Sequence, residues 1–253
     1  MNSWGDLIPG LLLSLLGLSL AVGAAMVLFV LCSKRKRLPQ PAPVLPFAFE
    51  PVQACYAAPR AAPHRPSLWL AIRNRNLHSV QTALGLHNPK PCTWSEGFTG
   101  DQRLFISPPV NGWILVMGSD LPDPSEDVDV CFRFLQEVSR KLGRVQFFNL
   151  HRVLNHHAWV HMEAGRVVRA YAWAGRTLWN QGIKTRAEQD LGLKCFGYGE
   201  GPEPARLALS DVLTANTEKV PLLAARWSID PASVDERILE RACGIAGKPT
   251  RLY

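Results

Sequence analysis

The stretch from residue 112 to residue 182 constrains the fold of this chain more than any other part. Its continuous apolar run, Trp113–Met117, predicts a central strand that is covered on both faces. Asp123 then opens a segment with apolar residues at helical spacing, which predicts a helix over 124–142. Strand-like runs joined by two-residue Ala-Gly turns follow and predict hairpins. The fold class is therefore predicted as α+β, a mainly antiparallel sheet with that helix packed on one face.

The remaining parts of the folded region carry weaker signals. Leu68–Ile72 predicts a short strand, whereas the segment 87–101, with its prolines and glycines, is typical of a loop. The C-terminal third predicts short helices near 185–192, 221–227 and 231–243. We expect these C-terminal helices to cover an edge or a face of the sheet.

An apolar run without charged residues predicts a membrane anchor near the N-terminus. At about 1.5 Å per helical residue, Leu11–Cys32 gives roughly 33 Å, which spans a hydrocarbon core of ~30 Å. The basic segment Ser33–Arg37 follows at once, and Asp6 is the only charged side chain before the run. Because Lys and Arg stay on the cytoplasmic side, we expect a single-pass membrane protein with its N-terminus outside and its main domain cytoplasmic.

Two features of this anchor leave alternatives open. A cleaved signal peptide carries its positive charges before the apolar core, whereas here they come after it, so an uncleaved anchor is favoured. Small residues such as Gly17 and Gly23 suit helix pairing, although these two do not form a Gly-x-x-x-Gly motif. The membrane is thus the partner expected for 11–32, and a homodimer through this helix stays open.

Composition and charge divide the chain into an anchor, a tether and a domain. Prolines recur throughout 38–66, and because proline lacks a backbone N–H, this part is expected to form neither helices nor sheets. More than half of the formal net charge of +7 falls in residues 1–66, so the rest lacks the dense basic face of a nucleic-acid binder, and nucleic acid is not an expected partner. The predicted parts are a tail (1–10), a transmembrane helix (11–32), a basic and Pro-rich linker (33–66) and a cytoplasmic α+β domain (67–253).

The histidines between 151 and 161 are the strongest candidates for a metal-binding or catalytic site. On a strand, His157 and His161 share one face but lie about 13 Å apart at ~3.3 Å per residue, too far to share a zinc ion bound ~2 Å from each nitrogen. On a helix their spacing would suit, but the His-Glu-x-x-His motif needs a glutamate where Ala158 stands. The alternative that stays open is a site formed by His156 or His157 with His151 across a neighbouring strand. Histidines packed against the neighbouring tryptophans are favoured, so we predict no metal site.

Cofactor and nucleophile signatures are weak in the rest of the chain. The glycine-rich stretch Gly197–Gly201 lacks the strand and the helix entry of a phosphate loop, and Glu200 would repel phosphate. The six cysteines include no Cys-x-x-Cys pair. Cys92, two residues from Lys90, becomes a nucleophile only if a histidine from 151–161 approaches it in space. No cofactor is expected.

Arginine and aromatic side chains recur on the strands between 145 and 180. Along Val168–Trp173, the large side chains of Arg169 and Tyr171 share one face with Trp173, and the small side chains share the other. Trp, Tyr and Arg dominate interface energies, which favours a protein or peptide partner on the large face. The alternative is that the C-terminal helices cover this face. The candidate surface or cleft comprises His151, Arg152, His157, Trp159, His161, Arg169, Tyr171 and Trp173.

Several separated motifs stand out between residues 100 and 235. They are Trp113–Gly118 with Leu121-Pro122, Gly143–Phe148, His151–Val153, His157–Trp159 and Trp227–Pro231. Together they resemble a family of membrane-anchored bacterial proteins to which no activity is attached. The resemblance implies a bacterial origin and a single α+β domain, and it brings no activity, cofactor or partner.

The function expected from these features is a membrane-anchored cytoplasmic binding or scaffolding module of unknown partner, without turnover. The alternative is a hydrolase-type or metal-dependent enzyme that uses the His151/His157/His161 region. The two hypotheses differ in geometry, because the enzyme needs these side chains to converge within ~3–4 Å of one another in a cleft.

Overall fold

The computed structural model describes residues 66–99, 101–200, 208–235, 239 and 242–250. The chain divides into two units at Val52, and all described residues belong to the second unit, Gln53–Tyr253. The predicted tail, the transmembrane helix and nearly all of the linker lie outside the described residues. Among the helices that are described, none is long and apolar enough to cross a membrane.

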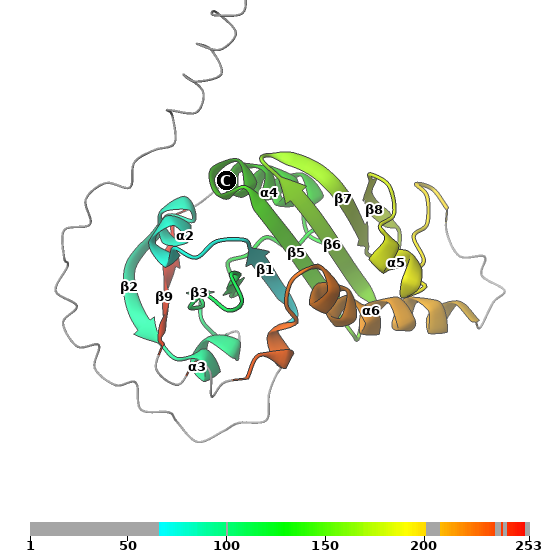
Figure 1. The fold of residues 1–253 in the computed structure, drawn as a ribbon. Coiled ribbons are helices and arrows are strands. Elements are labelled where there is room, and N and C mark those ends of the chain that lie inside the picture. Colours follow the sequence, from blue (N-terminus) through cyan, green and yellow to red (C-terminus); the bar gives the residue numbers. More distant parts are fainter. Residues whose placement is uncertain (1–65, 100, 201–207, 236–238, 240–241, 251–253) are drawn as a thin grey trace, which may run out of the picture. The chain divides into compact units, whose positions relative to one another are not determined.

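The described strands form one nine-stranded sheet in the order β2-β9-β3-β4-β1-β5-β6-β7-β8 (Figure 1). Every neighbouring pair is antiparallel, which confirms the predicted α+β class and the antiparallel sheet. The strands are β1 (Leu68–Ile72), β2 (Leu86–Cys92), β3 (Leu104–Ile106), β4 (Ile114–Met117), β5 (Arg144–His151), β6 (His156–Glu163), β7 (Arg166–Trp173), β8 (Thr177–Gln181) and β9 (Gly244–Pro249).

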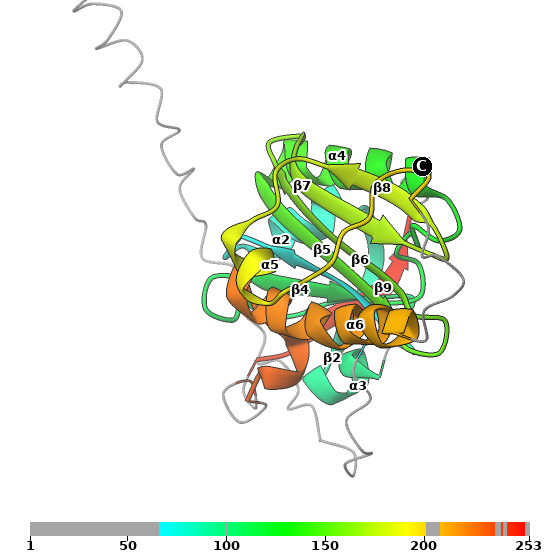
Figure 2. The same ribbon diagram turned by 90° about the vertical axis from the view of Figure 1, so that its right-hand side faces the viewer.

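Helices pack on both faces of this sheet and create two separate cores. One core lies between the sheet and α2 and α4, and the other lies between the sheet and α3, α5 and α6. Figure 2 shows α6 running across the strands in front of the sheet, with α4 behind it. The helices are α2 (Leu77–Ala83), α3 (Trp94–Phe98), α4 (Val128–Leu142), α5 (Arg186–Asp190) and α6 (Ala208–Trp227), with a short 3-10 turn η1 (Pro231–Ser233).

Helix α4 confirms the predicted helix but begins later than residue 124. Asp127 is its N-cap, and the carboxylate of Asp127 accepts hydrogen bonds from the backbone N–H groups of the first turn. The carboxylate of Asp123 instead accepts from Asn149 and closes a separate turn before the helix. The predicted apolar stripe is buried and includes Cys131, whose thiol pKa is raised by burial. Gly143 ends the helix with a φ of 87°.

The strands β6 and β7 divide their side chains between the two cores. Ala170 and Ala172 point toward α4, where their small size leaves room for the helix. Trp159, Tyr171 and Trp173 point to the other face and are buried under the C-terminal part of the chain. The alternative interpretation of this face, as a surface covered by C-terminal helices, is therefore the one that the structure adopts.

The C-terminal region corrects in part the prediction of a last helix over 231–243. Asp230 caps the short turn η1 as expected, and residue 239 is helical, but 234–235 and 242–243 are not, and 236–238 and 240–241 lie outside the described residues. The chain then enters the sheet as β9 between β2 and β3. The sequence of β9 has low strand propensity, so the pattern did not indicate it. Gly244 is required there, because a Cβ would lie 2.4 Å from the carbonyl oxygen of Ile106.

The segment 87–101, predicted as a loop, contains the edge strand β2 and the helix α3. Two prolines, Pro89 and Pro91, made β2 look like a loop, and prolines are tolerated in strands chiefly at a sheet edge. The short helix predicted at 221–227 is the end of the longer helix α6, which contains Pro221 in its interior. In both cases tertiary packing overrides the local signal of proline.

A buried ion pair ties the end of the sheet at β7 and β8 to α5. The Arg169 Nε lies 2.9 Å from the Glu188 carboxylate, and their side chains are only 2% and 0% exposed. The same carboxylate accepts a hydrogen bond from Trp159 Nε1 and, as part of a capping box, from the backbone N–H of Thr185. Arg169 also donates to the carbonyl oxygen of Gln181. These hydrogen bonds offset the free-energy cost of removing the two charges from water.

We expect Glu188→Ala to lower the free energy of unfolding by about 3–5 kcal/mol, because it leaves Arg169 buried without its counter-charge. Glu137→Ala is the matched control, since it removes a carboxylate from an exposed pair with Lys141 and should cost less than about 1 kcal/mol. Urea unfolding followed by tryptophan fluorescence measures both. Equal losses for the two variants would contradict a structural role for the buried pair.

Candidate functional site

Five of the eight predicted site residues are core residues. The side chains of His157, Trp159, Arg169, Tyr171 and Trp173 are at most 2% exposed. They face α6 and α5 and the segment between these helices, so no partner reaches them in this structure. The prediction that they form an accessible surface is therefore wrong, and the physical reason is that their apolar area is large enough to recruit the C-terminal helices.

His157 is held as a neutral, fully bonded core residue. Its Nδ1 lies 3.1 Å from the carbonyl oxygen of Asn155, which can only accept, so Nδ1 carries the proton. Its Nε2 then accepts a hydrogen bond from Asn216 Nδ2 at 3.3 Å. The ring stacks on Trp159 at an interplanar angle of 9°. Burial lowers the pKa of His157 to about 4.

The three histidines of the enzyme hypothesis do not converge. His151 is exposed at the end of β5 and pairs with His156, and it therefore points to the opposite face from His157. His161 lies further along β6, opposite Gln146, with its ring 5.7 Å from that of Trp227. Burial lowers the pKa of His161 as well. Within the described part of the chain, no three His, Cys, Asp or Glu side chains are placed to hold a metal ion.

The remaining predicted residues are also used within the fold or are remote. Arg152 Nε lies 2.7 Å from the carboxylate of Glu218 on α6. Cys92 is buried on β2, and β9, β3, β4, β1 and β5 separate it from the histidines of β6. The strand order therefore excludes a catalytic Cys–His pair between these two segments. The thiol of Cys92 instead donates a hydrogen bond to the carbonyl oxygen of Thr93.

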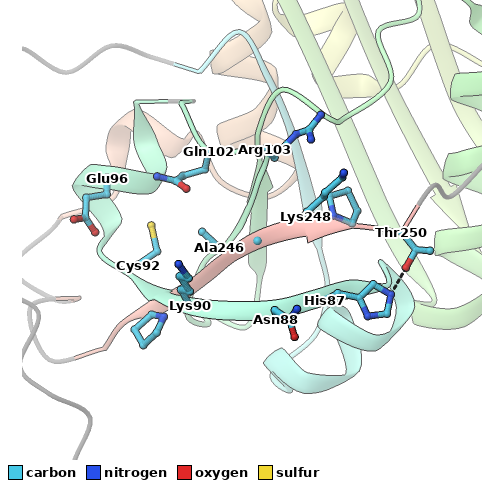
Figure 3. Close-up of a pocket in the computed structure, with 13 residues that line it drawn as sticks. His87, Asn88, Lys90, Cys92, Glu96, Gln102, Arg103, Ala246, Lys248 and Thr250 are labelled. Atoms are coloured by element: carbon cyan, nitrogen blue, oxygen red, sulfur yellow. Dashed lines mark hydrogen bonds between the residues drawn. The ribbon is translucent and has the colours of Figure 1, made fainter.

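A large open cleft lies at the other end of the sheet, over β2, β9 and the start of β3 (Figure 3). Its volume is about 850 Å³. None of the eight predicted site residues lines it. The side chains that determine its character are His87, Lys90, Glu96, Gln102, Arg103, Ala246 and Lys248.

The strand register explains why these side chains meet. Lys90 on β2 pairs with Ala246 on β9, and His87 pairs with Lys248. Arg103 directly precedes Leu104, the partner of Gly247, and therefore stands beside Lys248. Paired residues point to the same face of a sheet, so His87, Lys248 and Arg103 form one row across three strands. Ala246 is small and forms the floor of the cleft beside Lys90.

Helix α3 supplies the acidic wall of the cleft. Thr93 and Glu96 form a capping box, in which the Glu96 carboxylate accepts hydrogen bonds from the backbone N–H and the hydroxyl of Thr93. These bonds hold the pKa of Glu96 below its ordinary value. Gly97 lies against Phe105, where a Cβ would be 2.3 Å from the ring. The helix therefore packs tightly on β3, and its carboxylate is bonded back to its own first turn.

The cleft has an excess of positive charge. Arg103 Nε pairs with the Asp120 carboxylate at 3.2 Å, and His87 is hydrogen-bonded to Thr250. Lys90 and Lys248 are exposed, and no acidic side chain in the described ranges forms an ion pair with either. Two ammonium groups are thus available to an incoming ligand.

Sequence reasoning missed this site because its halves come from segments that carried no strand signal. Lys90 was considered only as a neighbour of Cys92, and Lys248 lies on β9, which was not predicted. The available signal was the spacing of apolar Ile245 with the small residues of 244–247, followed by a charged residue, which is too weak to indicate a strand.

Comparisons with known proteins do not assign the chain to a family. No family model, no curated protein and no solved structure matches it. The likeness to membrane-anchored bacterial proteins therefore stays a prediction from the motifs.

We expect His157 to make the folded domain less stable at acidic pH. The unfolded chain takes up a proton at His157 below its ordinary pKa of about 6.5, whereas the folded chain takes it up only near pH 4. Protonation therefore favours unfolding, and about 3 kcal/mol of stability is lost as the pH falls through this window. Urea unfolding at pH 7 and at pH 4 measures the loss.

The variant His157→Asn isolates this contribution. Its amide keeps a donor near the carbonyl oxygen of Asn155 but does not titrate. The loss of stability between pH 7 and pH 4 should be smaller in this variant than in the unchanged chain. Parallel pH profiles for the two proteins would contradict a buried neutral His157.

Proposed function

We propose that this chain is a single-pass, membrane-anchored binding module, whose cytoplasmic domain holds a protein or peptide partner in the cleft over β2, β9 and β3. The anchor part of the proposal comes from the sequence, because Leu11–Cys32 is followed by the basic segment Ser33–Arg37. The binding part comes from the cleft, and one observation carries it. Lys90 and Lys248 stand exposed in an open concavity without ion-pair partners among the described residues.

The fold of the rest of the domain favours binding at this end. The large aromatic face of β5, β6 and β7 is used as a core under α6, so it offers no docking area. The histidines of the enzyme hypothesis are divided between two faces of the sheet. The β2–β9–β3 cleft, in contrast, combines accessible charge with a rigid floor of paired strands.

The edge strand β2 also restricts how a partner binds. Pro89 and Pro91 lack the N–H groups that a new strand would need, so a partner does not extend the sheet at this edge. The exposed side chains of β2 and β9 are then the contacts that remain. A partner therefore lies on the face of the sheet, across the cleft, and is recognised by side chains.

Photo-crosslinking in cells tests this proposal. A photoreactive amino acid at Gln102, which lines the cleft, should give a discrete adduct of the full-length chain after illumination. The same amino acid at Arg133, which is exposed on α4 on the other side of the sheet, is the matched control and should give none. The absence of an adduct at residue 102, or the same adducts at both positions, would contradict a binding role for the cleft.

A further inference from the structure

We infer that the partner segment held in this cleft is an acidic, extended peptide, whose carboxylates pair with Lys90 and Lys248. This inference rests on the proposed function, because it names the chemistry of the ligand for the same cleft. It follows from the arrangement of charge on the floor and walls, from their spacing, and from the residue types that the lining lacks.

The spacing of the cations matches an extended chain. On one face of β9, Ala246 and Lys248 are two residues apart, which is about 6.6–6.8 Å, and Lys90 stands beside Ala246. Side chains on one face of an extended peptide repeat at the same interval of about 6.6–6.8 Å. A peptide lying along β9 therefore brings carboxylates at positions i and i+2 opposite Lys248 and Lys90 in turn.

The floor of the cleft permits a close approach of the peptide backbone. Ala246 carries the smallest side chain that β9 presents to the cleft between Lys90 and the start of β3. The lysines stand on either side of it in the close-up of Figure 3, with Gln102 and Arg103 on the far wall. Gln102 can accept and donate hydrogen bonds, so it suits the amide groups of a main chain.

The acidic groups near the cleft form no ion pair with its lysines within the described residues. The carboxylate of Glu96 is bonded to Thr93, and that of Asp120 is paired with Arg103. The carboxylates of Asp123, Glu126 and Asp127 line an adjoining pocket on the α4 side, which Lys248 also borders. An arriving carboxylate therefore meets two exposed ammonium groups. Exposed ion pairs of this kind are each worth up to about 1 kcal/mol, so recognition depends on more than one of them and is weakened by salt.

The lining also argues against single-stranded nucleic acid as the ligand. Base binding uses aromatic side chains as stacking platforms, and the only ring among the described lining residues with a π face is that of His87, which is bonded to Thr250. Most aromatic side chains of the described residues lie in the two cores, and the exposed Tyr198 does not line the cleft. A peptide needs no such platform, because its recognition here is ionic.

The test uses the full-length chain in neutral detergent micelles and a fluorescein-labelled octaglutamate peptide as the probe, followed by fluorescence anisotropy. We expect saturable binding that weakens as salt is raised. The double variant Lys90→Gln with Lys248→Gln should weaken binding about tenfold, as expected for the loss of two exposed ion pairs. The matched control, Arg133→Gln with Lys141→Gln, removes two positive charges from α4 and should change the affinity less than about twofold.

Four outcomes overturn the inference. Equal effects of the two double variants would show that the peptide responds to overall charge and not to the cleft. Displacement by inorganic phosphate, beyond the effect of chloride at the same ionic strength, would assign the cleft to phosphate. If octaglutamate does not bind but an adduct forms at residue 102, the cleft binds a partner that is not an acidic peptide. If octaglutamate does not bind and no adduct forms, the inference and the proposed function are both wrong.

Discussion

The buried ion pair between Arg169 and Glu188 decides which face of β7 is covered by the C-terminal helices. A charged guanidinium in the middle of an aromatic face is tolerated only if it is fully paired, and the carboxylate that pairs it comes from the capping box of α5. Because α5 must lie over β7 to supply this carboxylate, the following chain is placed over Trp159 and Tyr171. The face that looked like a binding surface becomes a core.

Because the aromatic face is used as a core, one end of the sheet stabilises the fold and the other end is free to bind a partner. The half formed by β5 to β8 is covered on both faces by α4, α5 and α6. At the opposite end of the sheet, formed by β2, β9 and β3, the one described helix on the side of the cleft is the small helix α3, and charged side chains are exposed. The two lysines that are proposed to recognise the ligand, Lys90 and Lys248, are exposed and belong to neither core.

Much of the fold follows from local patterns, and the candidate site does not. The hairpin turn at Ala164-Gly165 was predicted from two residues, and both have the positive φ values, 48° and 79°, that such turns require. The two faces of β7 were also predicted, although which face is covered depends on distant α6 and α5. The cleft joins β2 to β9, which lie at opposite ends of the domain sequence, and neither has a local strand signal. Only the tertiary pairing of Lys90 with Ala246 creates it.

Hydrogen exchange of the full-length chain, with and without octaglutamate, shows which end of the sheet holds the peptide. We expect backbone amides within 86–92 and 244–250 to exchange more slowly when the peptide is bound, because the peptide covers these strands. Amides of β6 and β7, already protected in the core, should not change. Slower exchange confined to 156–173, with none at the β2–β9–β3 end, would instead place the binding site on the aromatic face of β6 and β7.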